Sequence, residues 1–481
     1  MPDRNKGSQD RRAPKGYAGP VEKPRESRAS RSKASPARLA ALDVVRTVRE
    51  REAFAQDVIG KRIDGSSLSP EDRSFATLLA LGVVSSVGTL DDVLDRALSK
   101  PTDVQPDVRD ALRLSVYEII FLNKTPHAAV DQGVELVRSF APRAAGLANA
   151  VLRKVVASRA SFPFGDPTRD VEALARLHAF PVWLARKLVL DLGPQAALDF
   201  MRASNEPAPL FVAANAAKTD EVAVAAAFAK AGESTQPVEI DGVPVPGCLR
   251  VKDNRALLLP EVKQLFVQGK ILVSDAASQL VAASVLPQDK PASMLEVGAG
   301  RATKTILLQS AAQRTWGSQI ESYVTLDNHG FKTKLLLERA ARYGSCVLEA
   351  LTGDALALSN VVRDRLFDVV FIDAPCSGLG TLRRHPEIRW RLQPEDVAAF
   401  AKTQLGMLRA AAGHVAPGGT LAYATCTVTC EEDNQTVKAF LASEEGQRFQ
   451  LAPIAGRSCL ATRLEPGSSD AHFAVRFTRV S

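Results

Sequence analysis

The sequence predicts a multidomain fold with an all-helical domain, a small α+β module and a C-terminal α/β domain built on a mostly parallel sheet. Three observations predict it. The chain has 481 residues, and at about 150 residues per domain this length suggests three domains. Apolar residues recur at helical spacing from Ala37 to about residue 157. From about residue 271, short β-like runs alternate with helical stretches, which is the pattern of βαβ units.

The composition is that of an ordinary globular protein. Hydrophobic residues make up 46% of the chain and charged residues 24%, which excludes a fully disordered or collagen-like chain. The chain has no run of 18 apolar residues and its N-terminus is polar and basic, so we expect neither a transmembrane helix nor a secretory signal. Six sparse cysteines predict no disulfide scaffold and no structural zinc site. We therefore expect a cytoplasmic monomer without a metal ion or a membrane partner.

The positive charge is concentrated in residues 1–36. This segment holds 10 Lys and Arg against 4 Asp and Glu, a net charge of +6 out of +7 for the whole chain. A segment so poor in apolar residues cannot form a core, so we expect a disordered tail. A basic tail of this kind is typical of a nucleic-acid-binding arm. A solvated tail without a partner is the alternative, and the sequence leaves both open.

The helical domain is predicted to span residues 37–160. Leu112, Val116, Ile119 and Ile120 repeat at i, i+4, i+7 and i+8, as on one face of a helix. Breaks near residues 65–67, 100–101 and 142 divide the segment into about six helices. Such apolar stripes are normally core, and we interpret them as the core of a helical bundle.

Two further units follow a Phe/Pro/Gly-rich boundary at residues 161–167. Residues 168–270 open with a helical stretch and then turn mixed, so we expect a small α+β linker module there. Residues 271–481 are expected to form a Rossmann-like α/β domain. Its strands are predicted at 294–297, 323–326, 346–351, 367–372 and 420–425. In such sheets ligands bind at the carboxyl ends of the strands.

Acidic and glycine residues gather at three of these predicted strand ends. Gly298 and Gly300 lie in a turn between a strand and a helix, where glycine lets the backbone approach a ligand closely. Asp327 closes the next strand, where a carboxylate can accept the two hydroxyls of a ribose, and Asp354 ends the third. Each acidic residue alone is better explained as a helix cap. The glycine turn and the two aspartates, at three consecutive strand ends, together predict a nucleoside cofactor.

Two cysteines lie at the ends of the last two predicted strands. Cys376 stands in Asp-Ala-Pro-Cys-Ser-Gly (373–378), and Cys426 follows Tyr-Ala-Thr (423–425). A lone cysteine is more often a small buried apolar residue, but two at the ligand edge indicate thiol chemistry. We assign structural roles to the cysteines without this context, namely Cys248, Cys346, Cys430 and Cys459.

These motifs resemble the Nop2/Sun family of RNA 5-methylcytosine methyltransferases. Residues 373–378, with 383–390 after them, look like the family's fourth motif, and 417–426 resemble its next stretch with the nucleophile motif. Residues 119–122, 127–131 and 148–154 resemble the NusB-like RNA-binding helical domain. Their fusion is the architecture of the RsmB/Sun branch, which modifies small-subunit ribosomal RNA.

The resemblance implies a class I methyltransferase domain that uses S-adenosyl-L-methionine. It implies that Cys426 attacks cytosine C6, that Cys376 assists release, and that Asp373 bonds the cytosine edge or the cofactor's amino group. The residues expected at the cofactor are Glu296, Gly298, Ala299, Gly300, Arg301, Ala302, Thr303, Lys304, Asp327, Asp354 and Asp373. RNA is the expected partner. The basic run after Cys376 would suit phosphate contacts and stacking, with a solvated loop as the alternative: Arg383, Arg384, Arg389 and Trp390.

The sequence departs from the family in the cofactor loop. The family usually has Ala-Pro-Gly-Gly-Lys-Thr where this chain has Gly-Arg-Ala-Thr-Lys-Thr (300–305). Arg301 and Thr303 would crowd the cofactor's carboxylate, or Arg301 would pair with it. Two other functions stay open: a transfer-RNA methyltransferase, and an RNA-binding ribosome-assembly factor whose cofactor site has decayed. Retention of both cysteines and of three strand-end aspartates argues against decay.

Overall fold

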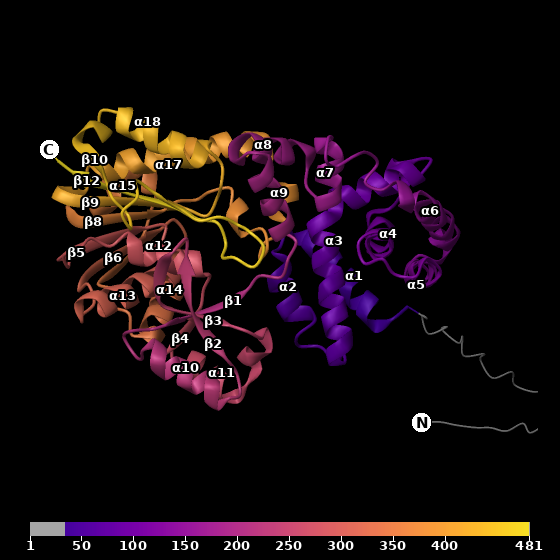
Figure 1. The fold of residues 1–481 in the computed structure, drawn as a ribbon, viewed down its shortest axis with the longest axis horizontal. Helices are drawn as coiled ribbons and strands as arrows, with labels where there is room; N and C mark the ends of the chain where they lie inside the picture. The colour runs from indigo at the N-terminus through magenta and orange to yellow at the C-terminus, as the bar shows by residue number, and fades with distance from the viewer. Residues whose placement is uncertain (1–33, 481) are drawn as a thin grey trace, which may run out of the picture.

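The computed structural model describes residues 34–480 of the chain. The tail predicted in residues 1–36 therefore lies almost wholly outside the described residues. The described part runs from a helical domain, through a middle region, to an α/β domain (Figure 1). The fold class is the one that the sequence predicts.

The helical domain contains six α-helices packed around one apolar core. Ser35 and Ser69 cap the first and third helices by accepting hydrogen bonds from the backbone N–H groups of Arg38 and Asp72. Proline follows each cap, at a position where its missing N–H costs nothing. The helices are α1 (Pro36–Arg51), α2 (Ala55–Arg62), α3 (Pro70–Ala97), α4 (Pro106–Ile120), α5 (Pro126–Arg138) and α6 (Ala145–Ser158).

Helix α3 is the central element of this bundle. Among the described helices, it is the one long and apolar enough to cross a membrane by length and composition. It packs instead against α1, α4 and α6, and 56% of its most apolar window is buried inside the protein. We interpret α3 as a core helix.

The middle region consists of five α-helices and a four-stranded antiparallel sheet in the order β2-β3-β1-β4. The fourth strand begins at residue 271, one residue after the predicted end of the module at 270. It is part of the middle region's sheet because it pairs with β1. Two helices cover this sheet, α10 (Glu221–Lys230) and α11 (Pro260–Val267). The other elements are α7 (Val171–His178), α8 (Val182–Leu192), α9 (Pro194–Ala203), β1 (Leu210–Ala214), β2 (Thr235–Ile240), β3 (Val243–Val251) and β4 (Ile271–Val273).

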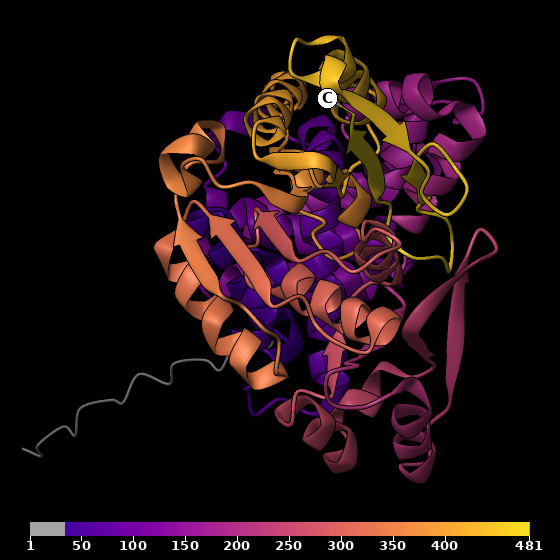
Figure 2. The same ribbon diagram turned by 90° about the vertical axis from the view of Figure 1, so that its left-hand side faces the viewer.

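The α/β domain is built on an eight-stranded sheet whose central path is β10-β12-β9-β8-β5-β6-β7, with β11 paired to β12. Strands β7, β6, β5, β8 and β9 are parallel, and β12 and β10 continue the sheet in antiparallel fashion. Figure 2 shows this twisted sheet with helices on both sides. Its strands are β5 (Ser293–Val297), β6 (Ser322–Asp327), β7 (Glu349–Thr352), β8 (Phe367–Asp373), β9 (Val415–Thr425), β10 (Phe449–Ala452), β11 (Leu460–Ala461) and β12 (Phe473–Arg479).

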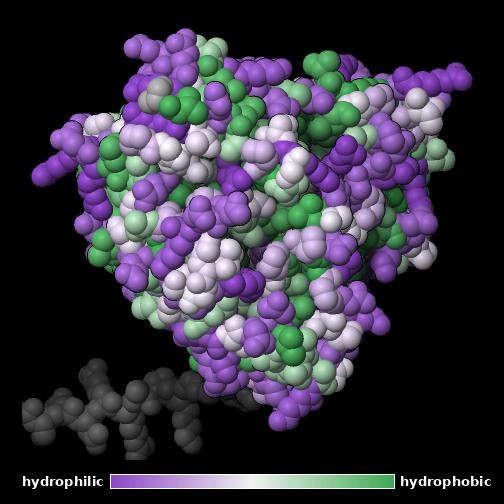
Figure 3. Space-filling model, turned by 60° about the vertical axis from the view of Figure 1, so that its left-hand side comes forward, coloured by the Kyte–Doolittle hydropathy of each residue, from purple (hydrophilic) through white to green (hydrophobic). Residues whose placement is uncertain are grey.

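The two faces of the sheet bury separate apolar cores. Helices α12, α13 and α14 cover one face, and α15, α17 and α18 cover the other. The outer surface in Figure 3 mixes polar and apolar side chains. The covering helices are α12 (Ala276–Ser284), α13 (Thr303–Trp316), α14 (Gly330–Tyr343), α15 (Leu358–Val362), α17 (Pro394–Ala412) and α18 (Thr436–Ala442). Both faces are closed, so the sheet is open to ligands at its strand ends.

Candidate active site

The predicted cofactor and catalytic residues lie at or beside the carboxyl ends of the parallel strands. Gly298 follows β5, Asp327 ends β6, Asp354 follows β7, Asp373 ends β8 and Cys426 follows β9. In the register of the sheet, Asp373 pairs with Ala424. The loop that carries Cys376 therefore runs beside the loop that carries Cys426.

The glycine turn after β5 is held by the two neighbouring strands. The backbone N–H groups of Gly298 and Ala299 donate to Leu326 O at 2.9 and 3.0 Å. Gly298 has a φ of +83°, and a Cβ at this position would lie 2.3 Å from Asp373 O. Gly300 donates its N–H to Asp327 Oδ2 at 3.0 Å. Glycine is thus required at 298, both for its left-handed backbone and for the close approach of β8.

The altered part of the cofactor loop also contains an unusual backbone. Ala302 has a φ of 68° and a ψ of 12° where it precedes α13. This left-handed conformation favours glycine, which is what the resembled family usually has there. Arg301 is exposed beside it, and the next residue, Thr303, begins the helix. The chain therefore has a left-handed residue at the position where the resembled family usually has glycine, and the alanine there is strained.

Asp327 and Asp354 differ in how they are held. Asp327 is mostly buried, accepts a hydrogen bond from the His329 N–H at 3.0 Å and lies 3.4 Å from Lys332 Nζ. Asp354 is exposed and caps the short turn after β7 by accepting from the Leu356 N–H at 2.9 Å. The helix-cap interpretation is thus realised at Asp354, although its carboxylate remains at the cofactor edge.

Glu296 is placed inside the domain, beneath the edge. Its carboxylate is fully buried and accepts hydrogen bonds from Thr305 Oγ1 at 2.6 Å and from the Tyr323 hydroxyl at 2.9 Å. Burial raises the pKa of Glu296 to about 7, against the opposing effect of these two hydrogen bonds. Both bonds go to Oε2 and fasten β5 to α13 and β6, while Oε1 is buried without a hydrogen-bond partner. Because the carboxylate is fully buried, the structure does not support its predicted contact with a cofactor.

Lys304 and Asp373 form an ion pair of 2.8 Å between Nζ and Oδ1. The lysine side chain is 9% exposed and the aspartate 29% exposed, so the aspartate forms the accessible end of the pair. Burial by itself lowers the pKa of Lys304, but the charge and hydrogen bond of Asp373 outweigh it and raise that pKa above its usual value. The site therefore contains a fixed ammonium whose partner faces the edge.

The two predicted thiols meet. Cys376 Sγ lies 3.2 Å from Cys426 Sγ, and the Cys426 N–H donates to Cys376 Sγ at 3.3 Å. Both side chains are half-buried. The hydrogen bond that the Cys376 thiol shares with the Cys426 sulfur, together with burial, raises the pKa of Cys376 well above its usual value, and the smaller effect of the Cys426 N–H opposes it. At such a separation, the two sulfurs can act on the same atom of a substrate.

Sequence reasoning missed Glu432, which lies between the two cysteine loops. Its carboxylate is fully buried and accepts from the Ser377 N–H at 2.8 Å and from Thr429 Oγ1 at 2.8 Å. In the sequence it stands in the acidic run 431–433. Such a run normally indicates a solvated surface, so the available signal pointed away from the site.

The structure does not support RNA contacts by Arg389. This side chain is fully buried and donates hydrogen bonds to Ala179 O at 3.2 Å and Ser204 O at 3.1 Å. Its guanidinium also lies 4.3 Å from the ring centre of Phe180. The residue therefore holds the middle region against the catalytic domain.

The rest of the basic run is also engaged within the chain. Trp390 Nε1 donates to Ser85 O on α3 at 2.8 Å, and the buried Arg383 pairs with Asp470 at 3.2 Å. Arg384 pairs with the same aspartate at 2.7 Å, but its side chain is 29% exposed. The prediction of an RNA-contacting run is thus unsupported for Arg383, Arg389 and Trp390. Sequence alone could not show that Arg383 and Arg389 are buried or that Trp390 is bonded to α3.

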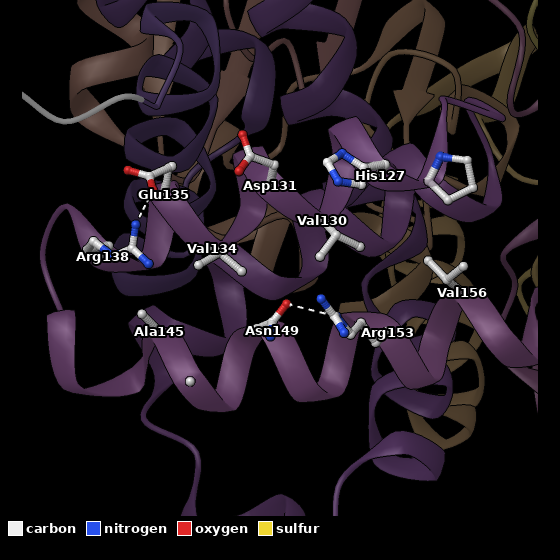
Figure 4. Close-up of a pocket in the computed structure, with 12 residues that line it drawn as sticks. His127, Val130, Asp131, Val134, Glu135, Arg138, Ala145, Asn149, Arg153 and Val156 are labelled. Carbon is white, nitrogen blue, oxygen red and sulfur yellow. Dashed lines mark hydrogen bonds and ion pairs between the residues drawn. The ribbon is translucent and has the colours of Figure 1, made fainter.

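A separate groove of about 560 Å³ lies between α5 and α6 in the helical domain (Figure 4). Its walls mix charged and apolar side chains, including His127, Asp131, Val134 and Arg153. In Figure 1 the helices α5 and α6 lie at the opposite end of the molecule from the sheet.

Across residues 34–480, no group of three or more His, Cys, Asp and Glu side chains is arranged to hold a metal ion.

The parallel sheet with its glycine turn, strand-end aspartates and paired thiols defines a class I methyltransferase domain joined to a helical domain. The comparisons then give the family. Residues 283–469 match the model of the 16S rRNA methyltransferase RsmB/F family, and residues 35–157 match that of the NusB family. The chain belongs to the RsmB/F family of methyltransferases, and its cofactor is S-adenosyl-L-methionine.

Relatives of this family match almost end to end. Ribosomal RNA small subunit methyltransferase B of Thermus thermophilus is 31% identical over 437 residues, 90% of this chain and 95% of its own. Probable ribosomal RNA small subunit methyltransferase B of Synechocystis is 30% identical over 419 residues, 86% and 91%. The crystal structure of PH0851 covers 92% of this chain and matches 99% of its own, with a TM-score of 0.75 at 22% identity, which shows the shared fold.

The described residues fit this cofactor. The strand ends present a glycine turn, the carboxylates of Asp327 and Asp354, and the accessible end of the Lys304–Asp373 pair along one edge. Asp327 suits a ribose, Asp354 suits an adenine edge, and Asp373 of the ion pair suits an ammonium. Arg301 is exposed in the loop and can meet a carboxylate without displacing a buried partner.

Proposed function

We propose that this protein methylates C5 of a cytosine in small-subunit ribosomal RNA. The observation that carries the proposal is the pair of thiols 3.2 Å apart at the cofactor edge. Methylation at carbon needs such a nucleophile, because C5 belongs to an aromatic ring and does not attack a methyl donor unaided. The names of the relatives from Thermus and Synechocystis support ribosomal RNA as the substrate. We also propose that the helical domain, predicted over 37–160, binds this RNA.

In this proposal Cys426 is the nucleophile. Its thiolate adds to cytosine C6, and the electron pair of the C5–C6 double bond makes C5 reactive toward a methyl group. When bound, S-adenosylmethionine would supply that methyl group from its sulfonium, with a neutral thioether as the other product. The C5 proton then passes to water, and its bonding pair restores the double bond and expels the sulfur of Cys426. Cys376 assists this departure by donating a hydrogen bond from its thiol to the departing sulfur.

The Lys304–Asp373 pair orients the reactants. Asp373, the more exposed partner, accepts a hydrogen bond from the amino edge of cytosine or from the cofactor's ammonium. Lys304 holds that carboxylate in place from the buried side. A base within a duplex cannot present C6 to a thiol, so the target cytosine must be unpaired or flipped out.

Covalent trapping tests the assignment of the two cysteines. Cys426→Ala is expected to abolish methyl transfer, because no thiolate remains to add to C6. Cys376→Ala is expected to accumulate a protein–RNA adduct that survives denaturation, because the departing sulfur lacks its hydrogen-bond donor. Denaturing gel electrophoresis of protein incubated with S-adenosylmethionine and unmodified 16S RNA measures both. An adduct that forms without Cys426 and requires Cys376 would reverse the roles.

The decayed assembly factor is the competing function. Its motivation is the altered loop at 301–303, but this structure retains the glycine turn, the ion pair and the paired thiols. Calorimetric titration with S-adenosylmethionine separates the two functions. The enzyme is expected to bind the cofactor, and failure to bind even in the presence of RNA would favour the assembly factor.

A further inference from the structure

Glu432 is bonded to both loops that carry the reacting thiols. It lies in the short π-helical turn Glu431–Gln435, which follows the Cys426 loop. Its Oε1 accepts from the Ser377 N–H at 2.8 Å and from Gln404 Nε2 at 3.1 Å. Its Oε2 accepts from the hydroxyls of Ser377, Thr427 and Thr429 at 2.6, 3.2 and 2.8 Å. Five potential donors, from the two cysteine loops and from α17, thus surround one carboxylate.

The bonded residues are the direct neighbours of the two cysteines. Ser377 follows Cys376 and Thr427 follows Cys426. Their hydroxyl oxygens lie 2.6 Å apart, each within hydrogen-bond distance of the same carboxylate oxygen. A hydrogen bond to an ionised group is roughly twice as strong as a neutral one. The buried side chain of Glu432 therefore holds the two cysteine loops together and so fixes the spacing of the two sulfurs.

The charges around the pair are unequal. The groups that face Cys376 are Cys426, the carboxylate of Glu432 and the phenol of Tyr423. Hydrogen bonding with Cys426 and burial raise the pKa of Cys376 most, and the negative charge of Glu432 raises it further. On the other side, a negative Cys426 attracts the ammonium of Lys304, which raises the pKa of that lysine after the larger contribution of Asp373. The negative charge of Glu432 thus disfavours a thiolate at Cys376, and the ammonium of Lys304 lies on the side of Cys426.

We propose that Glu432 is a positioning residue that fixes the spacing of the two sulfurs and makes Cys426, not Cys376, the thiolate of the pair. The proposal rests on the proposed function for its catalytic meaning. The selection of the reactive thiol is itself a property of the protein alone, present without RNA or cofactor.

Alkylation by iodoacetamide measures this selection directly. The full-length protein is labelled at about pH 8, and the rates at Cys376 and Cys426 are read from their peptides by mass spectrometry. In the wild type, Cys426 is expected to react faster. In Glu432→Gln, which keeps the size but removes the charge, the preference for Cys426 is expected to fall about tenfold, the effect of a change of one pKa unit. Glu431→Gln is the matched control, since Glu431 pairs with Lys187 away from the thiols, and should keep the wild-type preference.

Three results would overturn the proposal. The first is faster labelling of Cys376 in the wild type, which is decisive whatever the variants do. The second is an unchanged preference in Glu432→Gln that has kept its melting temperature. The third is loss of the preference in Glu432→Asp, which retains the charge and covers the case in which Glu432→Gln fails to fold.

The kcat for methyl transfer should fall about 100-fold in Glu432→Gln with KM for S-adenosylmethionine unchanged, which separates this role from cofactor binding. Selective alkylation without methyl transfer would contradict the proposed function and leave this inference standing.

Discussion

Ala302 holds a left-handed backbone at the start of α13, where an L-residue with a side chain is strained. We expect Ala302→Gly to raise the free energy of unfolding by about 1 kcal/mol, because glycine adopts this conformation without the steric cost. Urea denaturation followed by circular dichroism measures the change.

Ala299 in the same loop is the matched control for Ala302. Its φ is not positive, so Ala299→Gly only adds freedom to the unfolded chain and should lower stability. If both substitutions destabilise the protein equally, Ala302 is not strained and the altered loop has a different backbone.

His472 gives the protein a predictable sensitivity to acid. Burial, aided by the positive charge of Lys304, lowers the pKa of His472 from 6.5 to about 4. Between these values the unfolded chain binds a proton at this imidazole and the folded chain does not, so the free energy of unfolding falls as the pH is lowered through that window. The full shift corresponds to about 3 kcal/mol.

The variant His472→Phe isolates this contribution. Phenylalanine keeps an aromatic ring at this buried position and does not titrate. The stability of the variant relative to wild type should therefore rise as the pH falls from about 6.5 to about 4. Comparison with wild type is needed because Glu296, whose pKa burial raises to about 7, acts in the opposite direction. Parallel stability curves, measured by urea denaturation at each pH, would contradict the assignment.

At single positions, the sequence could predict the residues whose chemistry is visible in a local motif. Cys376, Cys426 and Asp373 stand in recognisable strand-end contexts, and the structure brings the two thiols together. Glu432 and Arg389 could not be assigned in this way. Their burial depends on segments far apart in the chain, such as the contact of Arg389 with Ala179.

Among the elements, the short helix α16 (Ile388–Arg391) joins the two halves of the protein. Trp390 packs against α3 so closely that a Cβ at Gly88 would lie 2.1 Å from its ring. Arg391 donates to the carbonyls of Glu52 and Ala53, both at 2.8 Å, just before α2. The loop that follows Cys376 thus anchors the helical domain.

Removing this anchor should weaken the docking of the domains. Trp390→Ala is expected to cost about 3 kcal/mol and to split the calorimetric unfolding of the protein into two transitions. Trp316→Ala is the matched control, because Trp316 bonds within the catalytic domain, to Gln288 O at 3.0 Å. A single transition at the wild-type temperature in Trp390→Ala would show that α16 does not couple the domains.

The sequence predicted the parallel strands better than the antiparallel ones. Long apolar runs with strand-end motifs mark β5, β6, β8 and β9, and each prediction overlaps the observed strand. Strands β10 and β12 were not predicted. Strand β10 is short and partly exposed, whereas β12 is mostly buried. Both form because β12 pairs with β9 and with β10 through contacts distant in sequence. The start of β9 at Val415 was also missed, where its pairing with β8 shifts register.

At the scale of the whole molecule, the helical domain, for which we propose RNA binding, contacts the domain that carries the candidate active site. The helical domain contacts the catalytic domain through α16, and Arg176 on α7 adds an ion pair of 2.9 Å to Asp92 on α3. Most of the net charge lies in the segment 1–36, so nucleic-acid binding by that segment stays a prediction, with a solvated tail as the alternative.

The identity of the methylated nucleoside tests the central claim most directly. Unmodified 16S RNA is incubated with labelled S-adenosylmethionine and either wild-type protein or Cys426→Ala, then digested to nucleosides and separated by chromatography. The account predicts label in 5-methylcytidine with the wild type and none with Cys426→Ala. Label in another nucleoside, or in 5-methylcytidine with Cys426→Ala, would contradict it.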